Sequence, residues 1–177
     1  GHRKVPFSKH LYIEKEDFLE EAGKKFFRLT IGKEVRLKSA YIVCGEKAIK
    51  NKEGDIVEVQ CTYDSKSKSG SGTEESLRKV KGTLHWVSKT HATPVEIREY
   101  DRLFMVPDPG AEDDFIKDLN PNSLKTKKGF AEPSLASPKI NERFQFQRKG
   151  YFVVDKDSTK DAAVFNKTVA LRDTWKK

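Results

Sequence analysis

Most of this chain alternates polar and apolar residues with a period of two. Five segments carry the alternation: 34–44, 55–64, 80–88, 143–155 and 167–175. Successive residues of a β-strand point to opposite faces of its sheet, so these segments are predicted to be half-buried strands. Short strands at such spacing are typical of barrels and sandwiches. The sequence therefore predicts an all-β fold, with few and short helices.

The faces of these strands predict a core. Val35 and Leu37 share a face, and Phe144 and Phe146 share another, ahead of a turn signal at Lys149–Gly150. Antiparallel barrels are expected to close around six apolar residues: Val57, Val59, Leu84, Trp86, Val169 and Leu171. Trp175 is expected to reach a core distant in the sequence.

Helices and loops are predicted from local composition. Residues 14–26 and 109–121 have acidic first turns and helix-stop residues, so each is expected to form a short helix. Residues 65–76 are rich in Ser, Gly and Lys and read as a flexible loop. Such a loop adds little packing, so deleting residues 66–73 is expected to leave the melting temperature nearly unchanged.

Charge and cysteine content limit the class of protein. The 177 residues contain 35 Lys and Arg against 27 Asp and Glu, a net charge of +8. This excess fits either a polyanion partner or an ordinary solvated surface, and charge alone does not separate them. Cys44 and Cys61 make no disulfide framework and are expected to pack as small hydrophobes, as in a reducing, cytosolic compartment. No apolar run approaches the ~20 residues of a membrane span, and no signal peptide is visible.

Motifs for catalysis and metal binding are missing from the sequence. His85 and His91 do not stand at zinc-ligand spacing with the two cysteines, so we expect no metal site. No serine lies in a G-x-S-x-G elbow, and neither Gly-rich phosphate-binding motif occurs. Catalysis by these residues alone is not expected.

Candidate binding residues fall in three places. The first is an extended basic arm that carries Arg3. The second follows the Ser/Gly/Lys-rich segment and contains Arg78, Lys79 and Lys81. The third is the segment with the two phenylalanines, which contains Gln145 and Arg148. Amide and guanidinium groups read base edges, aromatic rings stack on unpaired bases, and Lys and Arg bind phosphate, so this set fits single-stranded RNA. The alternative is a phenylalanine-rich core with polar residues facing outward.

Several long segments resemble one family. "KVKGTLHWVSKTHATPVEIREYDRLF" (79–104) is similar to the C-terminal region of the glutaminyl-tRNA synthetase family, a group of class I aminoacyl-tRNA synthetases. The same resemblance covers "RKVPFS", "KEVRLKSAYIV", "GFAEPSL", "FQFQRKGYF" and "VFNKTVALRDTW", in the order of the family and over nearly the whole chain.

The resemblance implies a fold and a domain division. It implies an anticodon-binding region built from two antiparallel β-barrels of the ribosomal L25-like type. Residues 1–92 and 162–177 would form a discontinuous proximal barrel, and residues 93–161 would form the distal barrel.

The resemblance also implies site residues. Arg3, Gln145 and Arg148 correspond to anticodon-reading positions, and Gln145 and Arg148 would read the central uridine. Arg78, Lys79 and Lys81 correspond to a basic loop beside the anticodon. The implied partner is tRNA(Gln), bound by a cytoplasmic monomer.

The activity implied by the resemblance is that of a glutamine–tRNA ligase, which uses ATP and Mg²⁺ in a catalytic domain. That domain and its HIGH motif are absent here. The "SKSKS" at 65–69 superficially resembles the KMSKS loop but lies in low-complexity sequence. This chain alone is therefore expected to be non-catalytic and to hold no cofactor.

Three alternatives remain. One is the anticodon-binding region of a β-barrel-type glutamyl-tRNA synthetase, whose anticodon shares the central uridine; "FQFQRKGYF" and "GFAEPSL" favour the glutaminyl type. The second is an L25-like barrel that binds ribosomal RNA, which the long run of motifs disfavours. The third is a metal-binding or hydrolytic protein, against which the missing ligand and nucleophile sets argue.

Overall fold

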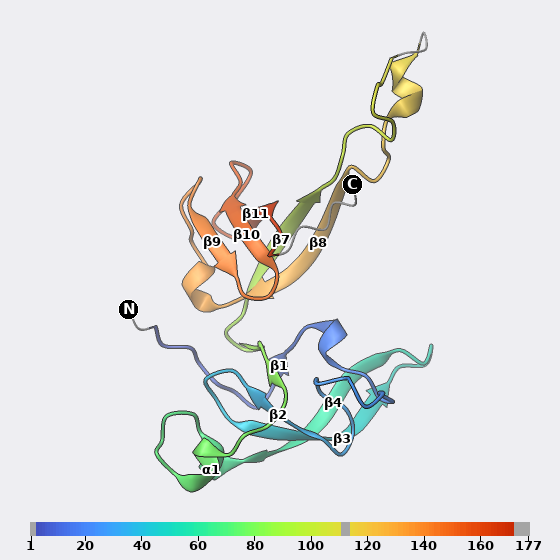
Figure 1. The fold of residues 1–177 in the computed structure, drawn as a ribbon. Helices are drawn as coiled ribbons and strands as arrows, with labels where there is room; N and C mark the ends of the chain where they lie inside the picture. Colours follow the sequence, from blue (N-terminus) through green and yellow to red (C-terminus); the bar gives the residue numbers. More distant parts are fainter. Residues whose placement is uncertain (1–2, 111–113, 172–177) are drawn as a thin grey trace. The chain divides into compact units, whose positions relative to one another are not determined.

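The chain divides into two compact units. The computed structural model describes residues 3–110 and 114–171 (Figure 1). The N-terminal unit comprises Ser8–Ser88, and the C-terminal unit comprises the chain from Lys89 on together with the residues up to Phe7. Strands dominate both units, and the helical elements span three or four residues each. The predicted all-β fold with few short helices is thus confirmed.

The N-terminal unit is built on a four-stranded sheet. Its order is β4-β3-β2-β5, with β2 at Glu34–Leu37, β3 at Ile42–Lys50, β4 at Ile56–Asp64 and β5 at Thr83–Leu84. A second, two-stranded sheet pairs β1 (Leu11–Tyr12) with β6 (Val87–Ser88). All of these pairings are antiparallel except that of β2 with β5, which is parallel.

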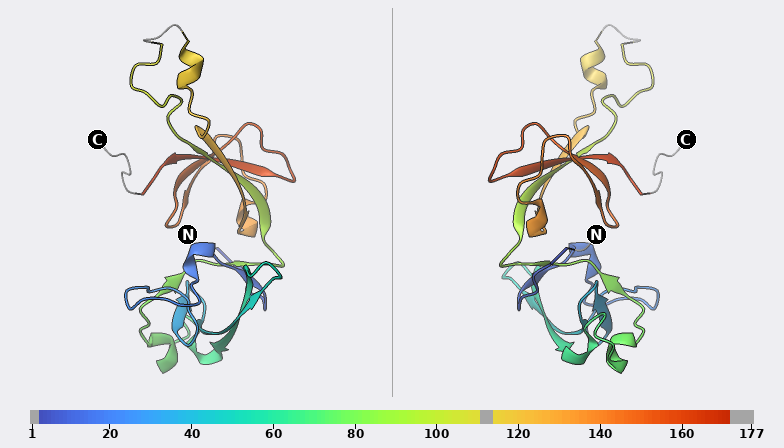
Figure 2. Two further views of the ribbon diagram at one scale, coloured as in Figure 1. Left: turned by 90° about the vertical axis from the view of Figure 1, so that its right-hand side faces the viewer. Right: turned by 90° about the vertical axis from the view of Figure 1, so that its left-hand side faces the viewer.

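The C-terminal unit is a twisted five-stranded sheet of order β8-β7-β11-β10-β9, seen from two sides in Figure 2. Its strands are β7 (Thr93–Tyr100), β8 (Leu124–Ala131), β9 (Arg143–Phe146), β10 (Gly150–Val154) and β11 (Ala163–Val169). The pairing of β11 with β7 is parallel. Among the described strands the ladder ends at β8 and β9, so it is an open sheet with two edges. The prediction of purely antiparallel pairing is therefore wrong at two places, β2 with β5 and β11 with β7.

The division differs from the predicted one at the end of the chain. Residues 162–177 were expected to return to the barrel of residues 1–92. Instead, β11 lies between β7 and β10 in the C-terminal unit, because Ala163–Asn166 pairs with Val95–Arg98 and the same strand also pairs with β10. Trp175 lies outside the described residues.

The predicted core of the N-terminal unit is partly confirmed. Leu84 and Trp86 are buried, as are Val35 and Leu37 of β2. Val57 is 63% exposed, so its assignment to the core is wrong. It lies on β4, the edge strand of its sheet, where most side chains on both faces meet solvent. Val59 on the same strand is half-buried.

The core of the C-terminal unit lies on one face of its sheet. Six buried residues form it: Val95, Ala131, Phe152, Val154, Ala163 and Phe165. Phe144 and Phe146 pack against this cluster as their shared face predicted, and the Phe146 ring stacks on Phe152 with centroids 4.4 Å apart. Val169 and Leu171 are exposed, so the prediction that they are core residues is wrong. Val169 is the last residue of β11, and Leu171 follows its end.

Neither predicted helix forms as expected. In the first segment only Lys15–Asp17 is helical, as a 3-10 turn (η1), and in the second only Phe115–Asp118 (η3). Phe18, which would have anchored the first helix, instead forms a β-bridge with Leu29. The buried Asp17 accepts a hydrogen bond from Arg28 at 2.9 Å. Long-range contacts therefore override the local helical pattern.

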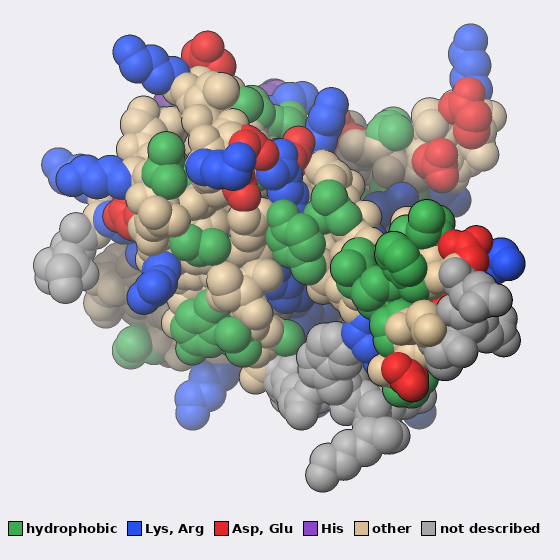
Figure 3. All heavy atoms as spheres, turned by 90° about the horizontal axis from the view of Figure 1, so that it is seen from above, with side chains coloured by type: hydrophobic (Ala, Val, Ile, Leu, Met, Phe, Trp, Pro, Cys, Tyr) green, Lys and Arg blue, Asp and Glu red, His purple; other side chains and the backbone are tan. Residues whose placement is uncertain are grey.

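The segment between β7 and β8 extends beyond the sheet (Figure 1). It carries exposed apolar side chains, among them Leu103, Met105, Val106, Phe115 and Ile116. Figure 3 views the molecule from above, the side toward which this segment projects, and shows hydrophobic side chains gathered among charged ones.

The two cysteines differ in their surroundings. Cys44 is half-buried, whereas Cys61 is exposed, so the prediction of core packing is wrong for Cys61. Desolvation of its sulfur atom, with help from Cys44 and Glu46, nevertheless raises the pKa of the Cys61 thiol to about 11. In the described part of the chain, no helix has the length and apolarity to cross a bilayer.

Candidate nucleic-acid interface

The hairpin of β9 and β10 presents Gln145 to solvent. Phe144 and Phe146 point into the core, so Gln145 between them points to the opposite face of the sheet, where it is exposed. Its amide makes no side-chain hydrogen bond to any of the described residues. An amide in this position has a donor and an acceptor available for a base edge.

The turn of this hairpin presents Arg148. Residues 147–149 form the turn, which the Lys149 amide closes by donating to the Phe146 carbonyl at 2.9 Å. Arg148 itself adopts the left-handed conformation, with φ of 67°. Gly150 follows with φ of 140°, and a Cβ there would lie 2.5 Å from the Val169 carbonyl oxygen. Only glycine fits this approach of β10 to β11, so the turn is held in place.

Arg3 is engaged in an ion pair within the C-terminal unit. Its Nε and Nη2 donate to the two carboxylate oxygens of Glu132 at 2.6 and 2.7 Å. These bonds raise the pKa of Arg3. A bidentate pair of this kind is geometrically specific, and it leaves Arg3 its two Nη1 hydrogens and the second Nη2 hydrogen for another partner. The structure brings Gln145 and Arg148 together on one hairpin and holds Arg3 in the same unit.

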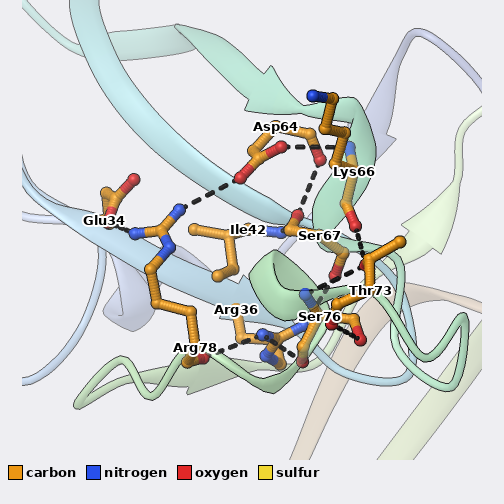
Figure 4. Close-up of polar contacts among 9 residues, drawn as sticks. All are labelled: Glu34, Arg36, Ile42, Asp64, Lys66, Ser67, Thr73, Ser76 and Arg78. Atoms are coloured by element: carbon orange, nitrogen blue, oxygen red, sulfur yellow. Dashed lines mark hydrogen bonds and ion pairs between the residues drawn. The ribbon is translucent and has the colours of Figure 1, made fainter.

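The segment predicted as a flexible loop is ordered. It contains the 3-10 turn η2 (Ser65–Ser67) and the helix α1 (Glu74–Leu77), which Thr73 caps by accepting from the Ser76 amide. Ser67 is fully buried; its hydroxyl accepts from the Ile42 amide at 2.8 Å and donates to the Asp64 carbonyl at 2.6 Å (Figure 4). The expectation of flexibility is therefore wrong.

Arg36 of β2 ties both ends of this segment to the sheet. Its guanidinium donates to the carbonyls of Ser67, Ser76 and Arg78 at 2.8 to 3.1 Å (Figure 4). It also donates to the Ser69 hydroxyl at 3.2 Å. One side chain thus satisfies acceptors from the start and the end of the segment. In the sequence, Arg36 is separated from these partners by 31 to 42 positions.

We expect deletion of residues 66–73 to lower the melting temperature by several degrees. The deletion removes Ser67 and with it the partner of the buried Ile42 amide, and an unsatisfied buried donor costs about 1–3 kcal/mol. A thermal melt compared with wild type measures the effect. Deleting only Gly70–Gly72, which leaves Ser67 in place, is the control and should lower the melting temperature less. An unchanged melting temperature for the longer deletion would contradict the ordered segment.

Arg78 closes the segment through ion pairs of its own. It pairs with Glu34 of β2 and with Asp64 of β4, the latter at 3.2 Å. The bond to Glu34 raises the pKa of Arg78, although desolvation acts the other way. The neighbouring Lys79 is exposed and makes no ion pair with the described residues. Of these two cations, Lys79 is the one whose charge is uncompensated by a neighbour.

A basic pocket of about 460 Å³ opens in the N-terminal unit. Lys24, Lys33 and Lys81 line it together with Phe27, and the Lys81 ammonium lies 5.5 Å from the centre of the Phe27 ring. Gly82 forms part of the wall, where a Cβ would lie 2.7 Å from the Phe27 carbonyl oxygen. Lysines around an accessible aromatic ring suit a phosphate with an attached base.

The sequence pointed to only one residue of this pocket, Lys81. Of the other cations, Lys24 lies in the segment predicted as a helix (14–26), whereas Arg28 and Lys33 lie beyond it and belong to no predicted site. The density of Lys, Arg and Phe in residues 24–33 was a signal that could have found them. Within the described residues, no group of three or more His, Cys, Asp or Glu side chains is placed to hold a metal ion.

The predicted site residues thus fall into two sets. Arg3, Gln145 and Arg148 lie in the C-terminal unit, whereas Arg78, Lys79 and Lys81 lie in the N-terminal unit. The N-terminal set lies beside the exposed Phe27 ring, which is the chemistry of single-stranded RNA recognition. Phe144 and Phe146, beside Gln145, point into the core instead.

Two family models match the chain. Both are described as the anticodon-binding domain of class I tRNA synthetases for glutamate and glutamine; one matches residues 1–64 and the other residues 83–155. Together they cover more than half of the chain.

Curated relatives agree with these matches. The chain is 51% identical over 177 residues to a glutamine–tRNA ligase of Proteus mirabilis and 53% identical over 178 residues to those of Shigella boydii and Escherichia coli O157:H7. Each alignment covers the whole chain but only 32% of the relative, so the chain spans about a third of their length. The chain belongs to the family of anticodon-binding domains of the class I glutamyl- and glutaminyl-tRNA synthetases.

Proposed function

We propose that this chain is the anticodon-binding part of a glutaminyl-tRNA synthetase and binds the anticodon loop of tRNA(Gln). The observation that carries the proposal is the identity of 51–53% to glutamine–tRNA ligases over the whole chain. In this proposal the protein works in the cytoplasm as a monomer. The other part of the longer protein attaches glutamine to the tRNA with ATP and Mg²⁺, whereas this chain alone is non-catalytic and binds neither cofactor.

The proposed roles follow from side-chain chemistry. The Gln145 amide both donates and accepts, as a uracil edge requires, and Arg148 adds donors from the adjoining turn. Lys79 and Lys81 bind phosphates, since an ammonium group is a point charge without base specificity. Arg3 joins the interface by exchanging its ion pair with Glu132 for RNA acceptors. Arg78 joins it by exchanging its ion pairs with Glu34 and Asp64. The assignment of residues 93–161 as the domain distal to the catalytic part stays a prediction.

Gln145→Ala is expected to weaken binding of the cognate anticodon stem-loop by about 1–3 kcal/mol, because a base-edge contact is lost. Arg148→Ala should do the same, and Arg3→Ala should follow if its ion pair with Glu132 opens. The measurement is a titration of each variant with the cognate stem-loop and with one whose central uridine is replaced. Gln147→Ala, an exposed amide in the same hairpin, is the control and should bind both loops as wild type does. Equal losses on both loops for Gln145→Ala would show that this residue reads no base.

Lys79→Ala is expected to weaken both stem-loops alike and to flatten the salt dependence, because a phosphate contact is blind to sequence. Each phosphate contact contributes about 0.7 to the slope of log K against log salt for a single strand. Titrations at three or more salt concentrations measure the slope. The control is Lys52→Ala, an exposed lysine in the β3–β4 turn, which should keep the wild-type slope. A loss confined to the cognate loop would contradict the role of Lys79.

A glutamyl-tRNA synthetase is the nearest alternative, since the matching family models cover both enzymes. Its anticodon shares the central uridine but differs elsewhere. Tighter binding of a glutamate-tRNA stem-loop than of a glutamine-tRNA stem-loop would favour it.

A further inference from the structure

We propose that Tyr151 is a stacking platform for the anticodon base that Gln145 reads. The inference rests on the proposed function and adds to it a residue whose contribution is stacking rather than hydrogen bonding. It follows from the way β9, β10 and β11 place side chains on the face of the sheet opposite the core.

Strand register puts Tyr151 beside Gln145. The two residues are direct partners in the antiparallel pairing of β9 and β10, as are Phe144 and Phe152 one step further on. Direct partners share a face of the sheet with Cβ atoms about 4.5–5.5 Å apart. Because Phe152 is buried and Tyr151 is 47% exposed, the pair of Tyr151 and Gln145 faces away from the core.

The backbone beneath Tyr151 is fixed on both sides. β10 pairs with β9 on one side and with β11 on the other, where Tyr151 is the partner of Val169. The Tyr151 carbonyl accepts a hydrogen bond from the Thr168 hydroxyl at 3.1 Å. Gly150, immediately before it, lies against the Val169 carbonyl. A tyrosine on such a support loses little conformational freedom when a base stacks on it.

The surroundings of Tyr151 suit a nucleotide. Its ring makes no ring contact with the described residues, so its exposed surface is available. Val169, 59% exposed, extends the apolar surface on the β11 side, and the Gln145 amide lies on the β9 side. Arg143 pairs with Val153 on this same face and supplies a positive charge two residues along the strand. Aromatic stacking with hydrogen bonds at the base edge is how proteins read unpaired bases.

The chemical class of the ligand follows from this arrangement. An aromatic ring stacks on any base, so Tyr151 contributes affinity, whereas selectivity comes from Gln145. A base that stacks on Tyr151 presents its edge toward the strand that carries Gln145. The partner is thus an unstacked nucleotide of single-stranded RNA.

The test is a cycle of protein and RNA changes. Wild type, Tyr151→Ala and Tyr151→Phe are titrated with the cognate anticodon stem-loop and with the same loop carrying an abasic central nucleotide. Tyr151→Ala is expected to lose about 5- to 150-fold in affinity for the cognate loop, the range typical of one stacked base. On the abasic loop the same variant should lose less than about 2-fold, because the stacking partner is missing there. Tyr151→Phe keeps the ring face and should bind both loops within about 2-fold of wild type.

Tyr100→Ala is the matched control. Tyr100 is likewise exposed but lies on β7, two strands away from β10 in the sheet. It should bind the cognate loop within about 2-fold of wild type, and thermal melts should show each variant folded. Equal losses for Tyr151→Ala on the cognate and abasic loops, or no loss on either, overturn the platform while leaving the proposed function intact. If wild type binds neither loop, the proposed function itself fails, and the platform with it.

Discussion

Replacing Trp86 by Ala is expected to lower the free energy of unfolding of the N-terminal unit by about 3–5 kcal/mol, the usual cost of removing a large buried aromatic side chain. Trp86 is 7% exposed and lies between the buried Leu84 and Val87. Its indole Nε1 donates to the Lys38 carbonyl at 3.0 Å. The substitution therefore leaves a cavity and an acceptor without its donor.

Denaturant unfolding measures this loss, and two further variants separate its causes. Trp86→Phe keeps most of the packing but lacks the indole donor, so it should cost less than Trp86→Ala. Val57→Ala removes an exposed side chain from the edge strand and should change stability by no more than about 0.5 kcal/mol. A loss below about 1 kcal/mol for Trp86→Ala would mean that Trp86 does not belong to the core.

Gly150→Ala is expected to destabilise the C-terminal unit by about 2–5 kcal/mol. The residue has φ of 140°, a conformation that costs an L-residue about 1–3 kcal/mol. The new methyl group would also lie 2.5 Å from the Val169 carbonyl oxygen, so β10 and β11 must separate, which is an overpacking cost of similar size. Since the turn before Gly150 presents Arg148, RNA binding should weaken together with stability.

Gly129→Ala is the control for this substitution. Gly129 lies on β8, and a Cβ there would meet only the Val95 side chain, at 3.9 Å. Its unfolding free energy should change by less than about 0.5 kcal/mol. If denaturant unfolding gave the same small change for both glycine substitutions, the close approach of β10 to β11 would not exist.

The strands and several of their buried faces could be predicted from the sequence, because the alternation of side chains is a local property. Val35, Leu37 and Phe144 were placed correctly for this reason. Exposure of Val57 and Val169 could not be predicted in the same way. It depends on whether a strand lies at an edge or a residue ends its strand, and neither is encoded in the alternation.

The candidate site shows the same limit. Gln145 and Arg148 are close in the sequence, so their common hairpin was visible. The ordered conformation of residues 65–77 could not be predicted, because it depends on Arg36 and on the Ile42 amide, which are distant in the sequence. The basic pocket likewise gathers Lys24 and Lys81 from segments that no local pattern connects.

The most direct test of the account compares two RNAs on the wild-type chain. One is the anticodon stem-loop of tRNA(Gln), and the other differs only in its central uridine. At equal salt, the cognate loop should bind at least about 10-fold more tightly, which corresponds to the loss of one good base contact. Equal affinity for the two loops, with the same salt dependence, would mean that the chain holds only the RNA backbone and would contradict the proposed reading of the anticodon.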